Sequence, residues 1–322
     1  MTPENIAFIR QCLPATFTMP YFADRESAWL LHRALPAPLA VRDVRKSIFG
    51  KLLDRPSIKP VIAQSGGVLA RENFEVMATA DLLATGCYKA SAAGLDEAVL
   101  RPWFDFSLSF TSWGTSGYWQ WNQTSRKGGN LVVQLGFPSQ HARLMGRYLG
   151  RNIRKEVEYP DHPIREVGCP TLAWARLDVD LDAGVVLIEE VQSDWLRNVS
   201  GRIRHMRRRA PRSRALKHME RYDFQLREAY ARMWPRAMLF AALHVAVDHL
   251  GCRTVWMHTP ESGVALKRIS GRLPPRSLYT DLPKAFCFEL VHDAPSFLVR
   301  PCRRTLSLLE NKAQPFFWKL AI

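Results

Sequence analysis

The sequence has few features of a metal protein, a membrane protein or a secreted protein. Its six cysteines lie far apart, and no pair has the close spacing of a zinc knuckle or a redox dithiol. The longest apolar stretch, residues 237–247, falls short of the roughly 18 residues that indicate a membrane span. The N-terminus lacks the basic and apolar segments of a signal peptide. We therefore expect a cytoplasmic protein with reduced thiols, no structural metal and no membrane span.

The sequence also lacks the glycine-rich loops of several common enzyme classes. It contains no Gly-x-Gly-x-x-Gly loop, no Walker-type loop and no Gly-x-Ser-x-Gly elbow, and it identifies no cofactor. Acidic residues are in the minority, with 30 Asp and Glu against 45 Lys and Arg; +10 of the net charge of +15 falls in residues 151–322. This excess favours an anionic partner, either nucleic acid or another polyanion. A chain from an arginine-rich proteome would show the same excess without such a partner.

The apolar content is high enough for a sizeable core, and the chain length allows one large domain or two. The first hundred residues are expected to form a helical N-terminal subdomain, residues 1–100. Thr2 as N-cap and Pro3 in the first turn mark the start of its first helix. Further helices are expected at residues 25–35, 41–53 and 69–83, the last closed by Gly86.

The rest of the chain, residues 101–322, is expected to form an α/β core domain, because strand patterns there alternate with helical ones. Strands are expected at residues 103–113, 131–137, 171–179, 185–191, 253–258 and 285–291. Helices are expected at residues 139–150, over a long region that ends at Gly251 with a break at Pro235, and at residues 261–269. The expected fold class is α/β (α+β): a mixed sheet with an antiparallel hairpin and a strand–helix–strand crossover, plus the helical N-terminal part.

One edge of the expected sheet collects polar side chains. If the strands that begin near Val185 and Thr254 share the sheet, their helical connection makes them parallel and the crossover right-handed. Ligands bind beyond the carboxyl ends of the strands in such sheets. Those ends are residues 189–195 and 258–261, and we expect the functional site there.

Four residues at these strand ends are the catalytic candidates. Alternation along a strand places Glu190, Gln192 and Asp194 on one face and Glu189 on the other, and His258 ends the second strand. Carboxylate, amide and imidazole groups can serve as general bases or bind a substrate. The alternative is structural: the glutamates pair with arginines, Asp194 caps the following helix, and His258 is a satisfied core histidine.

A basic run follows the expected site directly. Between Arg197 and Arg221 there are ten Lys and Arg residues and one acid, Glu220. Because the guanidinium fork donates paired hydrogen bonds to phosphate, the run predicts binding of phosphate or nucleic acid. A solvated loop, or a helix face that covers acidic neighbours, is the alternative. The expected phosphate-binding residues are Arg202, Arg204, Arg207, Arg208, Arg209 and Arg212.

An aromatic segment, Trp113–Trp121, precedes another small basic stretch, Arg126–Gly129. Exposed indoles beside such a stretch can stack on nucleobases. The alternative is a hairpin whose tryptophans fill the core. Tyr279 lies in a segment that we expect near the same sheet edge, within reach of the site.

The string IEEVQSDW, Ile188–Trp195, resembles a segment written EE(I/V)QSDW in the large polyvalent proteins of phages and mobile elements. In that family a helix and a strand of the type GYDRIAWT follow, and the counterpart here is LGCRTVWMHT, Leu250–Thr259. The resemblance covers about residues 171–269. In this chain Leu196 and Arg197 replace the HQ that usually follows the tryptophan. The resemblance implies a site location and no particular reaction.

The order strand, helix, strand, helix is also similar to part of the GNAT-type acyltransferases, which bind the pyrophosphate of acyl-CoA at a helix N-terminus. The nearest counterpart of their loop is Arg197–Arg202, whose spacing differs from the family pattern. This alternative predicts a cleft for pantetheine between Val191 and His258.

Three hypotheses follow from the sequence. The first is a nucleic-acid- or phosphate-associated protein with an enzyme-like pocket at the strand ends. The second is a GNAT-like acyltransferase that uses acyl-CoA. The third is a non-catalytic interaction module, which predicts that arginines pair with all the carboxylates and that there is no deep pocket.

Overall fold

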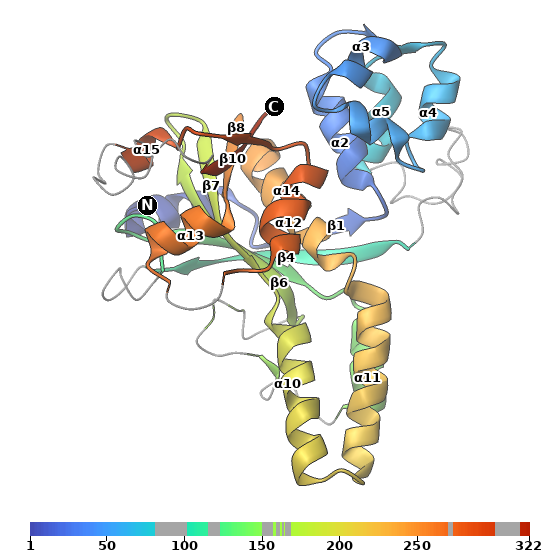
Figure 1. The fold of residues 1–322 in the computed structure, drawn as a ribbon, viewed down its shortest axis with the longest axis vertical. Coiled ribbons are helices and arrows are strands. Elements are labelled where there is room, and N and C mark those ends of the chain that lie inside the picture. Colours follow the sequence, from blue (N-terminus) through green and yellow to red (C-terminus); the bar gives the residue numbers. More distant parts are fainter. Residues whose placement is uncertain are drawn as a thin grey trace. The chain divides into compact units, whose positions relative to one another are not determined.

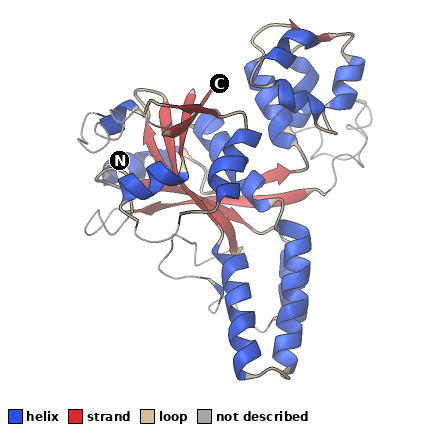
Figure 2. Ribbon diagram, viewed as in Figure 1, coloured by secondary structure: helices blue, strands red, loops and turns tan. Residues whose placement is uncertain are grey.

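An eight-stranded mixed sheet organises the larger part of the chain (Figures 1 and 2). The computed structural model describes residues 1–80, 102–114, 123–149, 157–158, 162, 164, 169–269, 273–299 and 316–322. The strand order in the sheet is β1-β4-β5-β6-β7-β8-β10-β9. Its strands are β1 (Thr16–Tyr21), β4 (Phe104–Trp113), β5 (Asn130–Gly136), β6 (Thr171–Asp180), β7 (Val185–Gln192), β8 (Thr254–His258), β9 (Glu289–Val291) and β10 (Phe317–Ala321).

The expected α/β class with a mixed sheet is confirmed. Strands β4, β5, β6 and β7 pair antiparallel in sequence order, and β7 pairs parallel with β8. The parallel register joins Val185 to Thr254 and ends at the pair Ile188 and Met257. Parallel strands need a long crossover, and the helices between residues 194 and 250 provide it.

The described residues divide into two units, each considered by itself. The larger unit draws on Met1–Met19, Phe106–Leu282 and Leu290–Lys319, and the smaller on Pro20–Asp105, Pro283–Glu289 and Leu320–Ile322. The division differs from the expected boundary near residue 100. Helix α1 (Pro3–Cys12) packs against β5 and so belongs to the larger unit. The smaller unit, which contains the other N-terminal helices, therefore begins at Pro20 and not at the N-terminus.

The smaller unit consists mainly of short helices. They are α2 (Arg25–Ala34), α3 (Val41–Lys46), α4 (Lys59–Gln64) and α5 (Glu72–Thr79), with a two-stranded sheet of β2 (Leu39–Ala40) and β3 (Val68–Leu69). The single helix expected at residues 41–53 is wrong. The chain turns after α3 and continues as a 3₁₀ helix, Gly50–Asp54. A β-carbon at Gly50 would lie 2.2 Å from the Arg45 carbonyl oxygen, so this close turn requires glycine. The Gly86 stop lies outside the described residues.

Two more sequence predictions are wrong in detail. The strand expected at residues 285–291 is only β9, because α14 (Leu282–Ala285) occupies its start. The N-cap position of α8 (His141–Tyr148) belongs to Gln140 and not to Ser139. The break expected at Pro235 is confirmed: α11 (Arg214–Tyr230) ends before it, and Pro235 lies in the first turn of α12 (Trp234–His244), where its missing N–H costs no helical hydrogen bond.

The remaining helices pack on the sheet or project from it. Helix α12 lies along β5, β6 and β7, and α13 (Pro260–Lys267) lies against β8. Leu187 of β7 and Trp256 of β8 belong to one buried apolar cluster with Leu266 of α13 and with α15 (Ser296–Val299). No helix among the described residues is long and apolar enough to span a membrane.

A helical hairpin extends away from the sheet within the larger unit (Figure 1). It consists of α10 (Asp194–Arg209) and α11 (Arg214–Tyr230), which the short segment 210–213 connects. A buried aromatic cluster holds its base. Trp195 Nε1 donates to the Tyr222 hydroxyl over 2.7 Å, His141 Nε2 lies 3.0 Å from the same hydroxyl, and the His141 ring stacks on Phe137.

The buried His141 predicts a loss of stability in acid. Burial lowers the pKa of His141 to about 3 from its ordinary value near 6.5, and Nδ1 has no hydrogen-bond partner among the described residues. Between about pH 6.5 and pH 3, the His141 imidazole is therefore protonated in the unfolded chain but not in the folded chain. The free energy of unfolding falls as the pH falls through this range. By linkage, acidification from about pH 7 to about pH 5 should cost about 2 kcal/mol through this residue.

The measurement is urea denaturation at both pH values. In His141→Gln, the pH-dependent loss of unfolding free energy should be smaller than in the wild type by that amount. His205→Gln, a substitution on the exposed side of α10, controls for the removal of an imidazole. An equal pH dependence in wild type and His141→Gln would show that His141 is not held neutral by burial.

Candidate functional site

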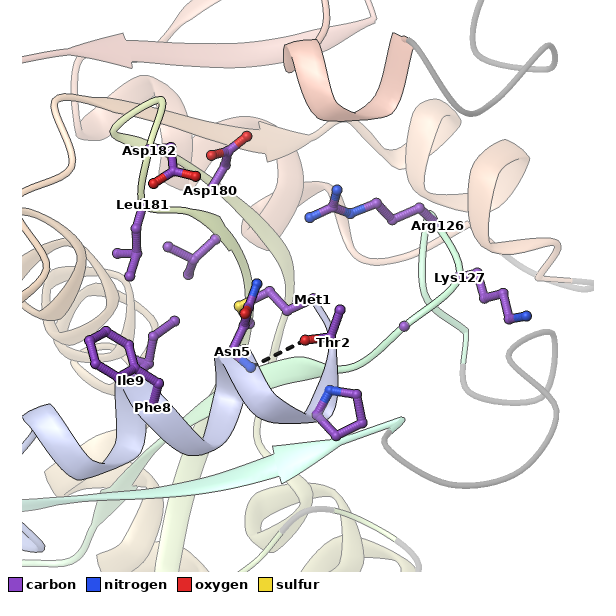
Figure 3. A pocket seen from close by; sticks show the side chains of 13 residues that line it. Met1, Thr2, Asn5, Phe8, Ile9, Arg126, Lys127, Asp180, Leu181 and Asp182 are labelled. Atoms are coloured by element: carbon purple, nitrogen blue, oxygen red, sulfur yellow. Dashed lines mark hydrogen bonds between the residues drawn. The ribbon is translucent and has the colours of Figure 1, made fainter.

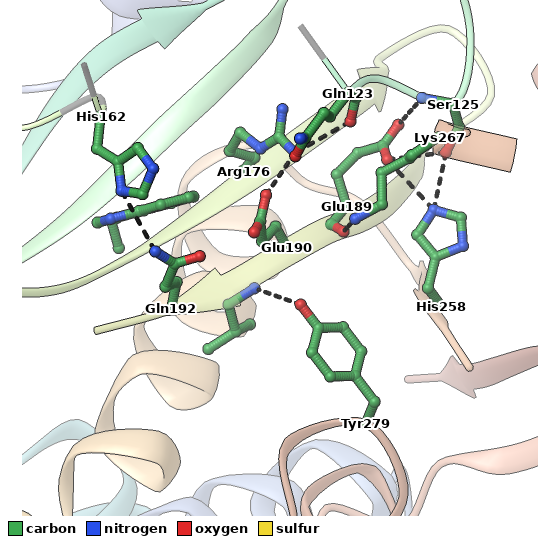
Figure 4. A network of polar contacts seen from close by, with 12 residues as sticks. Gln123, Ser125, His162, Arg176, Glu189, Glu190, Gln192, His258, Lys267 and Tyr279 are labelled. Atoms are coloured by element: carbon green, nitrogen blue, oxygen red, sulfur yellow. Dashed lines mark hydrogen bonds and ion pairs between the residues drawn. The ribbon is translucent and has the colours of Figure 1, made fainter. Parts of the chain in front are cut away.

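A one-residue bulge in β7 shapes the predicted site. Arg176 of β6 pairs with Glu190, but the next residue, Leu177, pairs with Ile188, so Glu189 is an extra residue in β7. A bulge interrupts the alternation of side chains along a strand. As a result both carboxylates are connected to the segment 123–125 (Figure 4). Glu189 accepts a hydrogen bond from Ser125, and Glu190 pairs with Arg176, which also donates to the Gln123 carbonyl oxygen. The expectation that Glu189 faces away from Glu190 is therefore wrong.

Glu189 lies in a fully buried polar network. Its carboxylate accepts hydrogen bonds from the Ser125 backbone N–H (3.0 Å) and from the Ser125 hydroxyl (2.8 Å). His258 Nε2 lies 3.2 Å from the same carboxylate and 2.8 Å from Ser125 Oγ (Figure 4). On the other side of the ring, His258 Nδ1 lies 2.9 Å from Ser262 Oγ. Burial works to raise the pKa of Glu189. The hydrogen bond with His258 and the electrostatic effect of His258, Lys267 and Arg176 are stronger together, so the pKa is lowered.

The Ser125, His258 and Glu189 side chains do not form a nucleophilic triad. In such a triad the carboxylate binds one imidazole nitrogen and the serine binds the other. Here Nε2 faces both groups, and a second serine occupies Nδ1. Burial lowers the pKa of His258, although Glu189 works in the opposite direction, so the contacts fit a neutral imidazole with its proton on Nε2.

Glu190 is held by a buried arginine. Arg176, 1% exposed, forms an ion pair with Glu190 and donates to the Gln123 carbonyl oxygen over 3.0 Å. Burial works to raise the pKa of Glu190, but the charges of Arg176 and Lys267 lower it on balance. The Arg176 guanidinium also lies 5.5 Å above the Trp113 ring. The ion pair makes Glu190 an ionised hydrogen-bond acceptor and a weak base.

Asp194 gathers donors from three segments of the chain. Trp174 Nε1 donates to its carboxylate over 3.0 Å, Gln192 Nε2 donates over 2.5 Å, and Arg197 forms an ion pair with it. His162 Nδ1 lies 2.6 Å from the same carboxylate. Burial works to raise the pKa of Asp194, but these hydrogen bonds lower it on balance. Ser193 occupies the N-cap position, so the alternative that Asp194 caps α10 is wrong.

A cavity of about 420 Å³ opens beside these carboxylates. Two tryptophans, three amide side chains, two arginines, one histidine and one glutamate line it. They are Trp113, Gln123, His162, Trp174, Arg176, Glu190, Gln192, Arg197 and Asn198. Of the four candidates from the sequence, Glu190 and Gln192 line the cavity, Asp194 lies directly behind it, and His258 does not line it.

The gap between the parting strands β7 and β8 is filled. Lys267 Nζ, from α13, donates to the Glu189 carbonyl oxygen over 2.8 Å, and the Tyr279 hydroxyl accepts the Val191 N–H over 3.3 Å (Figure 4). Trp318 Nε1 donates to the Tyr279 carbonyl oxygen over 2.8 Å. These side chains satisfy the backbone groups of β7 that lose their partner strand after Ile188. Tyr279 thus reaches the strand end, as expected.

Sequence reasoning missed several lining residues. Arg176 and Trp174 lie in the strand expected at residues 171–179, for which the sequence indicated no site, and Gln123 lies in a turn-rich stretch distant in sequence from β7. The aromatic segment gave a partial signal, because Trp113 is one wall of the cavity. The rest of that signal, residues 115–122, lies outside the described residues.

A second and larger cavity, about 700 Å³, lies at the β6–β7 turn. Figure 3 shows Arg126 and Lys127 across it from Asp180 and Asp182, with Phe8 of α1 on a third side. Its charged groups are spread around an apolar floor and do not converge on one point. The smaller cavity, where seven polar side chains meet two indoles, is the better candidate for specific binding.

The basic run lies on the projecting hairpin. Arg204, Arg207, Arg208 and Arg209 on α10, and Arg212 in the connection, are exposed, and Arg202 is half-buried. Arg207 forms an ion pair with Glu220 of α11. Groups of three or more His, Cys, Asp or Glu placed to hold a metal ion do not occur among the described residues.

This geometry defines an α/β protein with a polar cavity at the strand ends of a mixed sheet and a basic helical hairpin next to it. Comparisons of the chain with models of protein families, with curated proteins and with solved structures found no match.

The carboxylate of Asp194 should be important for stability. In Asp194→Asn, one carbonyl oxygen replaces two carboxylate oxygens. The new amide N–H₂ is a donor, and it would face the donors of Trp174, Gln192 and Arg197. We expect a loss of about 1–3 kcal/mol in the free energy of unfolding, since buried donors lose their acceptor. Asp182→Asn, at the exposed β6–β7 turn, makes the same chemical change and should cost less than about 0.5 kcal/mol. Urea denaturation measures both, and equal costs would contradict a structural role for the Asp194 cluster.

Proposed function

We propose that the protein binds nucleic acid, with its phosphates on the α10–α11 hairpin and an enzyme-like pocket at the strand ends beside it. The observation that carries this proposal is the exposed arginine run on a hairpin that projects from the sheet. Arginines on a projecting element reach a polyanion without steric conflict with the rest of the larger unit. Each phosphate contact releases counterions, so affinity falls steeply with salt.

The charge pattern of α10 supports this proposal over the alternative of a solvated face. Arg204, Arg208, Arg209 and Arg212 have no ion-pair partner among the residues that the structure describes, in contrast to Arg207. A helix face that covers acidic neighbours would pair most of its arginines. Unneutralised arginines close together repel one another, and an anionic partner removes that repulsion.

The two alternative functions have less support. A pantetheine cleft between Val191 and His258 would need the space that Tyr279 and Lys267 occupy, and both strand residues are buried. A non-catalytic module fits the paired carboxylates, but it does not account for the cavity. The likeness of Ile188–Trp195 to the polyvalent proteins stays a prediction.

A cytoplasmic location is also part of the proposal. Cys12, Cys169, Cys252 and Cys287 are the cysteines among the described residues, and all are free thiols, which suits a reducing compartment.

The test is binding of labelled RNA and DNA over a salt series. We expect affinity to fall steeply with salt in the wild type. The triple variant Arg204→Glu, Arg208→Glu, Arg212→Glu should bind at least about tenfold more weakly, with a salt slope smaller by about three. Arg10→Glu, Arg42→Glu, Lys59→Glu makes the same change in net charge at exposed positions elsewhere.

The control variant separates a binding surface from net charge. If the control loses as much affinity as the hairpin variant, binding reflects only the overall charge and the hairpin is not the site. If the wild type binds neither RNA nor DNA at low salt, the proposal is wrong. Thermal stabilisation by acyl-CoA would then favour the acyltransferase alternative.

A further inference from the structure

The helix that carries the arginines also lines the cavity. Arg197 and Asn198, in the first turns of α10, belong to the cavity wall. Residues 4, 7 and 11 positions after Arg197 lie on the same helix face, and they are Gly201, Arg204 and Arg208. At about 1.5 Å of rise per residue, this face runs about 16 Å outward from the cavity.

This face of α10 is open. The residues that face α11 and the sheet are others, and among them Val199 and Ile203 are buried. A β-carbon at Gly201 would have no heavy atom of the described residues within 4 Å outside its own helix. Arg204 and Arg208 are exposed. The face is therefore a basic track that begins at the cavity.

The cavity itself is built differently from the track. Glu190, in its wall, is paired with the buried Arg176, and the Asp194 carboxylate behind it is paired with Arg197, so a phosphate placed deep inside would have to displace an existing ion pair. A neutral ligand with both donors and acceptors at its edge fits better, because the Gln123 amide offers a donor and an acceptor, and the Gln192 carbonyl oxygen and the Glu190 carboxylate offer further acceptors. Phosphate binding is left to Arg197 and the track.

Two indoles line the cavity, and Trp113 is the more exposed of the two. Trp174 is 3% exposed, its Nε1 is fixed by Asp194, and the His162 ring packs edge-on against it at 5.4 Å. Trp113 lies under the Arg176 guanidinium. Fixed aromatic side chains stack on nucleobases, and a volume of about 420 Å³ falls in the range of small-ligand pockets.

We infer that the cavity is a pocket for one base of a single-stranded nucleic acid, whose backbone follows Arg197, Arg204 and Arg208 along α10. A base within a duplex cannot enter such a pocket unless it leaves the stack, so a single strand is the preferred ligand. The inference rests on the proposed binding of nucleic acid by the hairpin, and adds the strandedness and a base-specific contact.

The experiment compares three ligands by fluorescence anisotropy. They are a labelled single-stranded DNA of about 12 nucleotides, the duplex of the same length, and a single strand of equal length whose residues are all abasic. The abasic strand keeps the charge and loses the bases. We expect the wild type to bind the normal strand about tenfold more tightly than the abasic strand.

Variants assign that preference to the cavity. Trp113→Ala should lower affinity for the normal strand to that for the abasic strand and leave abasic binding unchanged, whereas Trp113→Phe, which keeps a stacking ring, should retain most of the preference. Gln123→Ala removes an exposed amide of the cavity wall, and serves if Trp113→Ala does not fold. Arg204→Glu with Arg208→Glu should weaken binding of both strands by the same factor.

The outcomes separate this inference from the proposed function. If the wild type binds normal and abasic strands equally, or if the cavity variants keep the full preference, the base pocket is wrong while nucleic-acid binding by the hairpin stands. Binding of the duplex as tight as that of the single strand would overturn the strandedness. If none of the ligands binds at low salt, the proposed function fails as well.

Discussion

The candidate site depends on one extra residue in β7. Without the bulge at Glu189, the carboxylates of Glu189 and Glu190 would point to opposite faces of the sheet. With it, both turn toward the segment 123–125 and lie within the field of the same buried cations. Arg176 and Lys267 are 1% and 5% exposed, and ionised groups persist at such depth only when they are paired. The bulge therefore creates a rigid ionic centre at the strand ends.

That centre separates paired charges from unpaired ones. Glu190 and Asp194 are paired with Arg176 and Arg197, whereas Arg204 and Arg208 lie exposed on α10 without an ion-pair partner among the described residues. A ligand that is anionic along its length and neutral at its heterocycles matches this separation. A compact polyanion such as a free pyrophosphate does not, because the cavity itself contains Glu190. Part of the excess of arginine in the composition is thus found on one element, helix α10.

The crossover was predictable from the sequence because local signals agree with the global fold. A β-branched strand at 185–191, a long helical region and a glycine at 251 indicate a parallel partner for β7, and Val185 does pair with Thr254. The location of Glu190 and Gln192 beside a cavity followed from the same rule. These inferences depend only on periodicity and on topology.

The bulge and most of the cavity wall could not be predicted, and the sequence left His258 open between a catalytic and a structural histidine. No glycine marks the bulge, so strict alternation placed Glu189 on the wrong face. The residue type of His258 suggests catalysis, and only its burial and its two serine neighbours show a structural contact. Ser125 contacts Glu189 of β7 across 64 positions of the chain, and Gln123 contacts Arg176 of β6 across 53, which no local pattern reports.

The most direct test of the central claim is photocrosslinking of a single-stranded DNA that carries 4-thiothymidine, followed by mass spectrometry of the crosslinked peptides. We expect crosslinks in the peptides that contain Trp113, Trp174 and Gln192, and in the first turns of α10. Crosslinks confined to the smaller unit, or spread over exposed basic residues without enrichment at the cavity, would contradict a base pocket at the strand ends.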